Sequence, residues 1–480
     1  MNKELRRVSM FVLLMFLALF ASSSIIQVLQ QDALQADGRN VRVLYASFNA
    51  DRGAILASDG TVIAQTVPSD GEISVQRVYP EGELYSPVTG YFTLNQGTTG
   101  IEAEFNDYLS GTANEQFLDQ LTAIFTGQQP KGAAVRTTID PVVQRAAWDA
   151  LAGRSGAVVA LDPATGRILA MVSSPTFDPN ALAVHDTEQV ITTYNGLLAD
   201  PGDPLINRAI AGDLNPPGST FKLVVATAAL ESGEYSADSQ LPNPPSLQLP
   251  QSDTVITNSG GSVCGGAATA TIATAIRLSC NIIFAELGAE LGATAVGAQA
   301  EAFGFGDDSL GIPIPVEPSV YPTPESDAQL MLSAFGQANV RATPLQMAMV
   351  SAAVANGGVL QRPTLVDSII GPDLSPIDTV EPEIYNTAMS STTADAMTAM
   401  MLAAVSNGVS SNARISGVDV AGKTGTAEDG QGSYSLWFTG FAPADDPQVA
   451  VAVVLENAEG FGNTVAAPIA RAVMEAVLNR

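Results

Sequence analysis

The feature that most constrains this chain is a stretch of 24 residues near its N-terminus, Val8–Gln31, that contains no charged side chain. As a helix it would reach about 36 Å at ~1.5 Å per residue, enough to span the roughly 30 Å hydrocarbon layer of a membrane. Lys3, Arg6 and Arg7 precede it, and basic flanks remain in the cytoplasm. We therefore expect a single-pass membrane anchor within residues 1–34 and an extracytoplasmic remainder. A cleaved signal peptide is the alternative, although the small residues after the apolar core form a poor cleavage site.

The bulk properties indicate a packed, multidomain protein. A length of 480 residues exceeds what one hydrophobic core usually supports, so we expect two or three domains. The composition, 46% hydrophobic and 15% charged, is typical of globular proteins. A formal net charge of −28 leaves no basic surplus to neutralise phosphates, which argues against nucleic acid as a partner.

Two regions follow the anchor, and both are of the α+β class. Residues 35–132 contain short alternating runs and turn signals, with strands expected at Val41–Tyr45 and Gly71–Gln76 and a short helix at Ala113–Phe125. Over residues 133–480, strands at both ends enclose a largely helical middle. This order predicts one antiparallel sheet sandwiched by helices.

The elements of this second region follow from hydrophobic periodicity, turn residues and capping residues. Its strands are predicted at Gly156–Leu161, Arg167–Val172, Leu436–Phe441 and Val449–Leu455. Its helices are predicted at Asp140–Leu151, Phe221–Leu230, Thr269–Leu278, Pro344–Ala355, Ala394–Val405 and Ala466–Leu478.

Ser219 and Lys222 are the centre of the expected chemistry. A Pro-Pro-Gly run directly before Ser219 cannot lie inside a helix, so the helix that follows must begin near the serine. The two side chains then lie one turn apart on one face. A serine hydroxyl needs a neighbouring base, and lysine can serve if burial or nearby positive charge lowers its pKa from ~10.4 towards neutrality. Taken alone, the pair also fits an N-capping serine followed by a solvated lysine.

The lysine inventory supports the catalytic interpretation. The chain contains 17 arginines but four lysines: Lys3 in the anchor flank, Lys131 between the two regions, Lys222 and Lys423. Arginine cannot release its proton in a protein, so lysine is needed where a proton must move. The only histidine, His185, lies in a predicted exposed turn, so neither a serine-histidine triad nor a histidine-based metal site is expected. We expect no metal and no cofactor.

The run Lys423-Thr424-Gly425-Thr426 is expected on or beside an edge strand, where Gly425 permits close approach of another backbone. A tetrahedral oxyanion needs two aimed backbone N–H groups, and those of Ser219 and Thr426 are the candidates. Lys423, with Thr424 or Thr426, is a candidate to bind a substrate carboxylate. A solvated Lys-Thr-Gly turn is the alternative.

Ser279 and Asn281 follow the helix expected at Thr269–Leu278. Ser279 is a candidate to relay a proton between Lys222, Lys423 and a leaving nitrogen, and Asn281 is a candidate to hold a substrate amide. Alone, this pattern also fits ordinary helix capping.

Cys264 and Cys280 are the only cysteines, separated by 16 residues. In an exported protein we expect them to form a disulfide, worth roughly 3 kcal/mol in the loop-entropy model. Two free buried thiols are the alternative.

The three motifs, Ser-x-x-Lys, Ser-x-Asn and Lys-Thr-Gly in this order, resemble those of the penicillin-binding proteins and serine β-lactamases. Wider matches lie at Arg52–Ile55, Gly100–Glu102, Thr137–Asp140, Gly156–Pro163, Ser174–Asn180 and Trp437–Pro443. The chain after the anchor thus resembles the class B penicillin-binding proteins. Residues 35–132 correspond to the dimerisation-like pedestal domain, similar to that of the actinobacterial penicillin-binding protein A group, and residues 133–480 to the transpeptidase domain.

The resemblance implies a peptidoglycan D,D-transpeptidase with Ser219, Lys222, Ser279 and Lys423 as catalytic residues. Ser219 would attack the penultimate D-Ala of a stem pentapeptide, release the terminal D-Ala and pass the acyl group to an acceptor amine. β-Lactams would trap Ser219 as a stable ester, and proteins of the division machinery are candidate partners. Cys280 departs from the family, which usually has another small residue there.

Several related functions compete with this interpretation. The first region is too short for the glycosyltransferase domain of class A members, and no Glu-x-x-x-Asn run of the kind a β-lactamase needs lies between Asn281 and Lys423. A D,D-carboxypeptidase remains open, as does a non-catalytic division scaffold or β-lactam sensor, although about seven residues precede the span.

Overall fold

The computed structural model describes most of the chain, namely residues 2–30, 48, 50–71, 73–93, 95–117, 120, 125, 131–259, 261–428 and 432–480. The strand expected at Val41–Tyr45 lies outside the described residues. The helices and strands seen are of the α+β class, as predicted.

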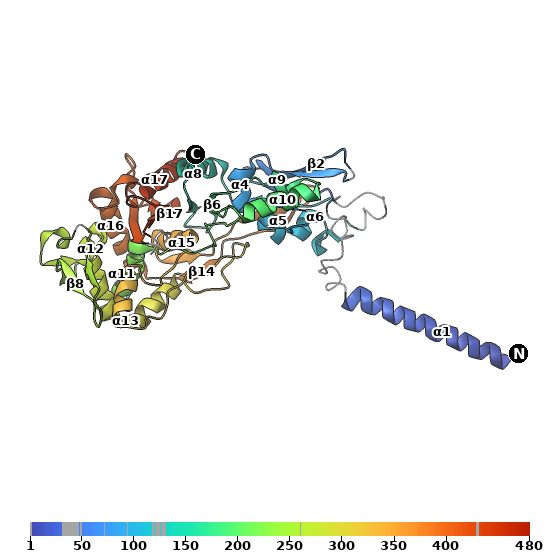
Figure 1. Cartoon of the computed structure of the whole chain (residues 1–480), viewed down its shortest axis with the longest axis horizontal. Helices are drawn as coiled ribbons and strands as arrows, with labels where there is room; N and C mark the ends of the chain where they lie inside the picture. Colours follow the sequence, from blue (N-terminus) through green and yellow to red (C-terminus); the bar gives the residue numbers. More distant parts are fainter. Residues whose placement is uncertain are drawn as a thin grey trace.

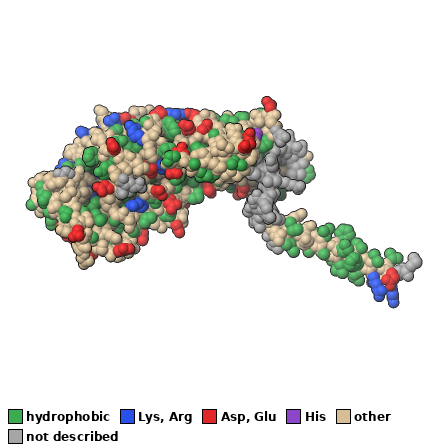
Figure 2. Space-filling view, viewed as in Figure 1, with side chains coloured by type: hydrophobic (Ala, Val, Ile, Leu, Met, Phe, Trp, Pro, Cys, Tyr) green, Lys and Arg blue, Asp and Glu red, His purple; other side chains and the backbone are tan. Residues whose placement is uncertain are grey.

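The N-terminal apolar segment forms helix α1, Asn2–Ser24, which continues through a π-helical turn at Ile25–Leu29. Its 25-residue section Lys3–Gln27 is long and apolar enough to cross a membrane, and none of that section's apolar window is buried. Figure 2 shows hydrophobic side chains along α1 and basic side chains at its N-terminal end. The expected helix is confirmed, and its length and surface suit a membrane anchor.

The larger domain is built on a five-stranded antiparallel sheet in the order β15-β16-β17-β5-β6. The strands are β5 (Gly156–Leu161), β6 (Ile168–Ser174), β15 (Ala421–Glu428), β16 (Tyr434–Ala442) and β17 (Val449–Ala458). Helices lie on both faces: α8 (Pro141–Leu151), α11 (Lys222–Glu231), α12 (Ile272–Leu278), α13 (Asn281–Ala302), α14 (Asp327–Ser333), α15 (Pro344–Ala355), α16 (Ser391–Asn407) and α17 (Ala466–Leu478).

Alternation along the strands divides the interior into two cores. On β5, Ala157 and Val159 face the core that contains α11, α13 and α15, whereas Val158 and Ala160 face the core formed by α8 and α17. Because successive side chains of a strand point to opposite faces, a continuous apolar run can serve both cores. This explains why every residue of β5 is buried.

A six-stranded sheet, in the order β13-β12-β4-β1-β2-β3, supports the pedestal. Its strands are β1 (Ile55–Leu56), β2 (Val62–Pro68), β3 (Val75–Val78), β4 (Ala134–Thr137), β12 (Val366–Ile370) and β13 (Pro376–Thr379). Helices α4 (Gly82–Thr89), α5 (Gly100–Glu104) and α6 (Asn106–Ser110) and a 3-10 turn at Asn114–Gln116 complete this part. Three of the six strands therefore come from residues beyond 132, and the sheet continues across the boundary expected there.

A segment of the larger domain also reaches back onto the pedestal. Helices α9 (Asn180–Ala183) and α10 (Thr187–Leu198) lie beside pedestal helices in Figure 1. Asn180 Nδ2 donates to Tyr79 O at 2.8 Å, and Tyr79 N donates to Asn180 Oδ1 at 2.9 Å. Gln76 adds a bond from Nε2 to Ala183 O at 2.7 Å.

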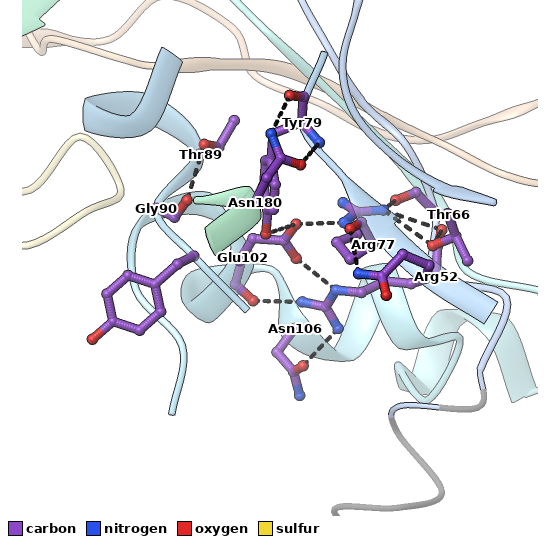
Figure 3. A network of polar contacts seen from close by, with 12 residues as sticks. Arg52, Thr66, Arg77, Tyr79, Thr89, Gly90, Glu102, Asn106 and Asn180 are labelled. Atoms are coloured by element: carbon purple, nitrogen blue, oxygen red, sulfur yellow. Dashed lines mark hydrogen bonds and ion pairs between the residues drawn. The ribbon is translucent and has the colours of Figure 1, made fainter. Parts of the chain in front are cut away.

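Glu102 is the centre of a buried ionic network in the pedestal (Figure 3). Its carboxylate accepts from Arg52 Nε and Arg77 Nε, each at 2.6 Å, and from Tyr79 OH at 3.2 Å. Burial alone would raise the pKa of Glu102, but the attraction and hydrogen bonds of the two arginines outweigh it and hold the pKa below its usual value. Arg52 also donates to Glu102 O and Asn106 Oδ1, so the network joins the segment just before β1 to α5 and α6.

We expect Glu102→Ala to lower the free energy of unfolding by about 3–5 kcal/mol, because it leaves two guanidinium groups buried without their counterion. Urea denaturation measures this loss. Glu81→Ala is the matched control, since it removes a half-exposed ion pair with Arg145 and should cost less than about 1 kcal/mol. Equal losses in the two variants would contradict a structural role for the network.

The structure corrects some of the predicted boundaries. The strand expected at Gly71–Gln76 is wrong in position, because a turn closed by a hydrogen bond from Ser69 N to Ser74 O delays it to Val75. The helix expected at Thr269–Leu278 begins at Ile272, since Thr269–Thr271 forms strand β10 and Thr271 caps the helix. Of the helix expected at Ala113–Phe125, the described part contains the 3-10 turn, and several residues lie outside the description.

A small hairpin lobe, residues 240–271, lies beside α12 and α13 (Figure 1). It contains two two-stranded sheets, β7 with β10 and β8 with β9. The strands are β7 (Gln240–Pro242), β8 (Ser246–Gln248), β9 (Val255–Thr257) and β10 (Thr269–Thr271). A third pair joins β11 (Val359–Gln361) to β14 (Ile384–Thr387) elsewhere in the domain.

Candidate active site

The loop that carries Ser219 is held against the edge strand β15. Gly218 has a φ of +52° and donates from N to Gly336 O at 3.0 Å. Trp437 Nε1 donates to Pro216 O at 2.9 Å. A Cβ at Gly425 would lie 2.7 Å from Pro217 O, so only glycine permits this approach of strand and loop.

Ser219 lies in a 3-10 turn, Gly218–Thr220, and α11 begins at Lys222. The Pro-Pro-Gly run thus ends where the helical pattern starts, as expected. Ser219 is half-buried, whereas Lys222 is fully buried. Among the hydrogen bonds described, none joins Ser219 Oγ to Lys222 Nζ, a bond that often tightens in enzymes when substrate binds.

Lys222 is directed towards the turn between α12 and α13. Its Nζ lies 2.8 Å from Ser279 O, 2.7 Å from Asn281 Oδ1 and 3.3 Å from Ser279 Oγ. The rings of Phe284 and Phe335 lie 5.7 and 6.0 Å from the same nitrogen. Burial, together with the charge of Lys423, holds the pKa of Lys222 well below 10.5.

Lys423 meets Lys222 at a shared hydroxyl. Its Nζ donates to Ser279 Oγ at 2.8 Å and to Thr424 O at 2.8 Å. Burial lowers the pKa of Lys423 to about 7. The two amines and the Ser279 hydroxyl therefore form a continuous path for a proton, with both lysines shifted towards the neutral form.

Strand β15 is an edge strand, as predicted, and its outer side faces the site. Thr424 N donates to Ser410 Oγ at 3.1 Å, so this N–H points away from β16. Alternate residues of a strand direct their N–H groups to the same side, and the Thr426 N–H therefore also points outward. A Cβ at Gly218 would lie 3.2 Å from Thr426 O, which places the serine loop beside this backbone.

The two threonines differ in availability. Thr424 Oγ1 lies 3.3 Å from Val409 O and 3.2 Å from Ser410 Oγ, and the residue is 7% exposed. Thr426 is more exposed, and its Oγ1 accepts from Gly462 N at 3.2 Å, which leaves its own O–H free to donate. Thr426 is thus the better placed of the two for a carboxylate.

These residues surround an open cleft of about 760 Å³. Its walls include most of the residues predicted from sequence: Ser219, Ser279, Asn281, Thr424, Gly425 and Thr426. They also include residues that the sequence did not single out: Asn258, Phe335, Gln337, Tyr434, Phe461 and Thr464.

Cys264 and Cys280 are joined by a disulfide, with their Cα atoms 5.7 Å apart. Cys280 lies between Ser279 and Asn281, so the bond ties this turn to the hairpin lobe. No group of three or more His, Cys, Asp or Glu side chains suited to a metal ion occurs in the described part of the chain. His185 lies near Gly71 of the pedestal and is partly buried rather than exposed.

Known families match both regions of the chain, and a known relative matches its full length. Residues 156–475 match the penicillin binding protein transpeptidase domain, and residues 52–135 match the penicillin binding protein A dimerisation domain. The peptidoglycan D,D-transpeptidase PbpA of Mycolicibacterium smegmatis is 41% identical, covering 100% of this chain and 99% of the relative.

Two solved structures of a relative also match the fold of the chain. The ceftriaxone acyl-enzyme complex of penicillin-binding protein A from M. tuberculosis matches with a TM-score of 0.87 and 40% identity over 90% of this chain and 100% of that chain. The penicillin G acyl-enzyme complex of the same relative matches with a TM-score of 0.85 and 41% identity over 89% of this chain and 100% of that chain.

Proposed function

The chain belongs to the penicillin-binding protein transpeptidases, and we propose that it is a peptidoglycan D,D-transpeptidase that acts through an acyl-enzyme on Ser219. The observation that carries the assignment of residues is the joint placement of Lys222, Ser279 and Lys423 in one hydrogen-bonded network behind the cleft that Ser219 lines.

The lowered pKa of Lys222 suits it to the role of base. A neutral amine has two hydrogens and one lone pair. Donation to Ser279 O and Asn281 Oδ1 uses both hydrogens and leaves one lone pair, which can accept either the Ser219 proton or the proton of the Ser279 hydroxyl at 3.3 Å. The Ser219 oxygen then bonds to the carbonyl carbon of the penultimate D-Ala, and the N–H groups of Ser219 and Thr426 stabilise the resulting oxyanion.

Collapse of this intermediate breaks the amide bond to the terminal D-Ala. The leaving nitrogen takes a proton, which Lys222 returns through Ser279, with Lys423 2.8 Å from the same hydroxyl. An acceptor amine then attacks the ester, loses a proton to the same network and forms the cross-link, and Ser219 regains its hydrogen. Each proton removed in one half-reaction is returned in the same half-reaction.

Substrate binding follows from the groups that remain available in the cleft. The free hydroxyl hydrogen of Thr426 suits the carboxylate of the terminal D-Ala, and Lys423, buried behind the cleft, adds positive charge when it is protonated. Asn281 Nδ2 donates one hydrogen to Thr257 O at 2.9 Å and retains a second for a substrate carbonyl.

The position of the anchor completes the proposal. Lys3, Arg6 and Arg7, at the N-terminal end of α1, favour a cytoplasmic location for that end, so we propose that the cleft lies on the outer side of the membrane, where peptidoglycan and β-lactams are found. Proteins of the division machinery are the proposed partners at this location.

In Lys423→Met, the acid limb of the pH profile of the acylation rate should move to higher pH. The charge of Lys423 helps to lower the pKa of Lys222, so its removal raises that pKa. The neutral fraction of Lys222 falls as pH drops through its pKa, and a higher pKa moves this fall upward. Stopped-flow acylation across pH 5–10 measures the midpoint, with Lys131→Met as control. An unmoved midpoint in Lys423→Met would refute the coupling of the two lysines.

Incubation with a stem pentapeptide and an acceptor amine tests the reaction itself. A transpeptidase releases D-Ala and forms the acceptor-linked product. Release of D-Ala without incorporation of the acceptor would instead assign a D,D-carboxypeptidase, and no release together with stable penicillin binding would assign a sensor or scaffold.

A further inference from the structure

The start of helix α13, which carries Asn281, has no capping side chain from the residue before it. Helix α12 ends at Leu278 and is followed by Ser279, which has a left-handed backbone with φ of +60°; α13 begins at Asn281. The residue at the N-cap of α13 is Cys280, whose side chain makes no capping hydrogen bond. The first N–H groups of a helix have no partner within the helix, so these need an acceptor from elsewhere.

Asn258 of the hairpin lobe supplies that acceptor. Its Oδ1 accepts from Asn281 N at 2.8 Å and from Ile282 N at 3.2 Å. The other end of the amide donates to Ser262 O at 3.3 Å, and the residue is 3% exposed. A capping side chain normally comes from the residue just before the helix. Here it comes from a separate lobe, 23 residues earlier in the chain.

The bond from Asn258 continues into the catalytic network. Asn281 is held by Asn258 at its backbone and by Thr257 O at its side chain, and its Oδ1 faces Lys222 Nζ at 2.7 Å. A shift of the first turn of α13 would therefore move an acceptor that orients the Lys222 amine. A displacement of about 1 Å at such a group can cost on the order of 100-fold in rate.

The disulfide adds a second attachment of a different kind. Cys264 is fixed in the lobe by Asn243, which donates to Cys264 O at 2.6 Å and accepts from Cys264 N at 3.1 Å. The bond to Cys280 limits the travel of the turn but offers no acceptor to the N–H groups of Asn281 and Ile282. The role of Asn258 can thus be separated from that of the disulfide.

We propose that Asn258 is a positioning residue of the reaction, which acts through Asn281 on the Lys222 amine. The hairpin lobe is then a frame that sets the geometry of the Ser279–Asn281 turn. This inference rests on the proposed roles of Lys222 and Ser279.

Penicillin acylation of the full chain in detergent tests the proposal, with the rate constant measured on the alkaline plateau of its pH profile. We expect Asn258→Ala to lower this rate constant about 10- to 100-fold while the half-saturating penicillin concentration stays within about threefold. Asn258→Asp restores an acceptor of the same shape and should recover the rate to within about threefold of wild type. If Asn258→Ala does not fold, Asn258→Gln, whose acceptor is displaced by one methylene, carries the same expectation.

Asp186→Ala is the matched control. Asp186 caps α10 by accepting from Glu188 N and Gln189 N at 3.0 Å each, and α10 lies against the pedestal. This variant should lose comparable thermal stability and keep the wild-type acylation rate constant.

Two results would overturn the positioning role: a wild-type rate constant in Asn258→Ala, or no recovery in Asn258→Asp. Failure of the proposed function looks different, because the wild-type chain itself would then not be acylated.

Discussion

Ser219→Ala is expected to reduce covalent labelling by a fluorescent penicillin to background. Ser219 is the hydroxyl that combines exposure to the cleft with the position one turn before a fully buried lysine. Loss of a serine nucleophile elsewhere costs on the order of 10⁶-fold in rate, because no other group forms the ester. The variant should remain folded, since the Ser219 side chain has no hydrogen bond among those described. Gel fluorescence after fixed exposure times measures the loss.

Ser232→Ala is the matched control for this substitution. Ser232 directly follows α11, the helix that begins after the Ser219 turn, and its hydroxyl donates to Ala229 O at 2.7 Å, remote from the cleft. It should label at the wild-type rate. Equal labelling of Ser219→Ala and Ser232→Ala would mean that another residue is the nucleophile.

Lys222→Arg is expected to lose acylation by about 10²- to 10⁴-fold although both side chains are able to carry a positive charge. Arginine does not deprotonate in a protein, so it cannot accept the Ser219 proton. The native Lys222 differs in its protonation, because burial and the charge of Lys423 lower its pKa and so favour the neutral amine. Stopped-flow acylation by penicillin gives the rate constant.

Lys131→Arg is the corresponding control, since Lys131 is exposed and lies near the pedestal strand β1, where no proton needs to move. It should acylate normally. A Lys222→Arg chain that keeps the wild-type rate constant would show that the base lies elsewhere.

The parts of the site that the sequence predicted are those set by local geometry. A Pro-Pro-Gly run can precede a helix but not continue it, so the start of the helix beside Ser219 and the spacing to Lys222 follow from neighbouring residues. The sandwich of one antiparallel sheet between helices was also predictable, because β5, β6, β16 and β17 are rich in apolar residues. The catalytic roles of Ser219 and Lys222 stay predictions.

The parts that were missed depend on contacts between distant residues. Asn258 follows a short strand and resembles any turn asparagine, and its role appears only when the lobe folds against α13. Likewise, nothing in the sequence around Ser410 indicates that its hydroxyl accepts a hydrogen bond from the Thr424 N–H. Strands β12 and β13 join the pedestal sheet through a pairing of Val366 with Thr137, which no periodicity in either segment indicates.

The position of β3 illustrates a smaller error of the same kind. Alternation alone favoured a strand from Gly71, but the Ser69–Ser74 hydrogen bond closes a turn there and delays the strand. Turn closure competes with strand pairing for the same backbone groups, and the outcome depends on the partner strand β2. Local pattern therefore located the strand without fixing its boundary.

Ser219, activated by a neutral Lys222, is expected to capture the carbonyl carbon of a β-lactam. Intact-mass and peptide-mapping mass spectrometry of the full chain after exposure to benzylpenicillin tests it most directly. We expect a gain of one intact penicillin per chain, located on the peptide that contains Ser219. An unchanged mass, or an adduct on a peptide that lacks Ser219, such as the one with Ser279, would contradict it.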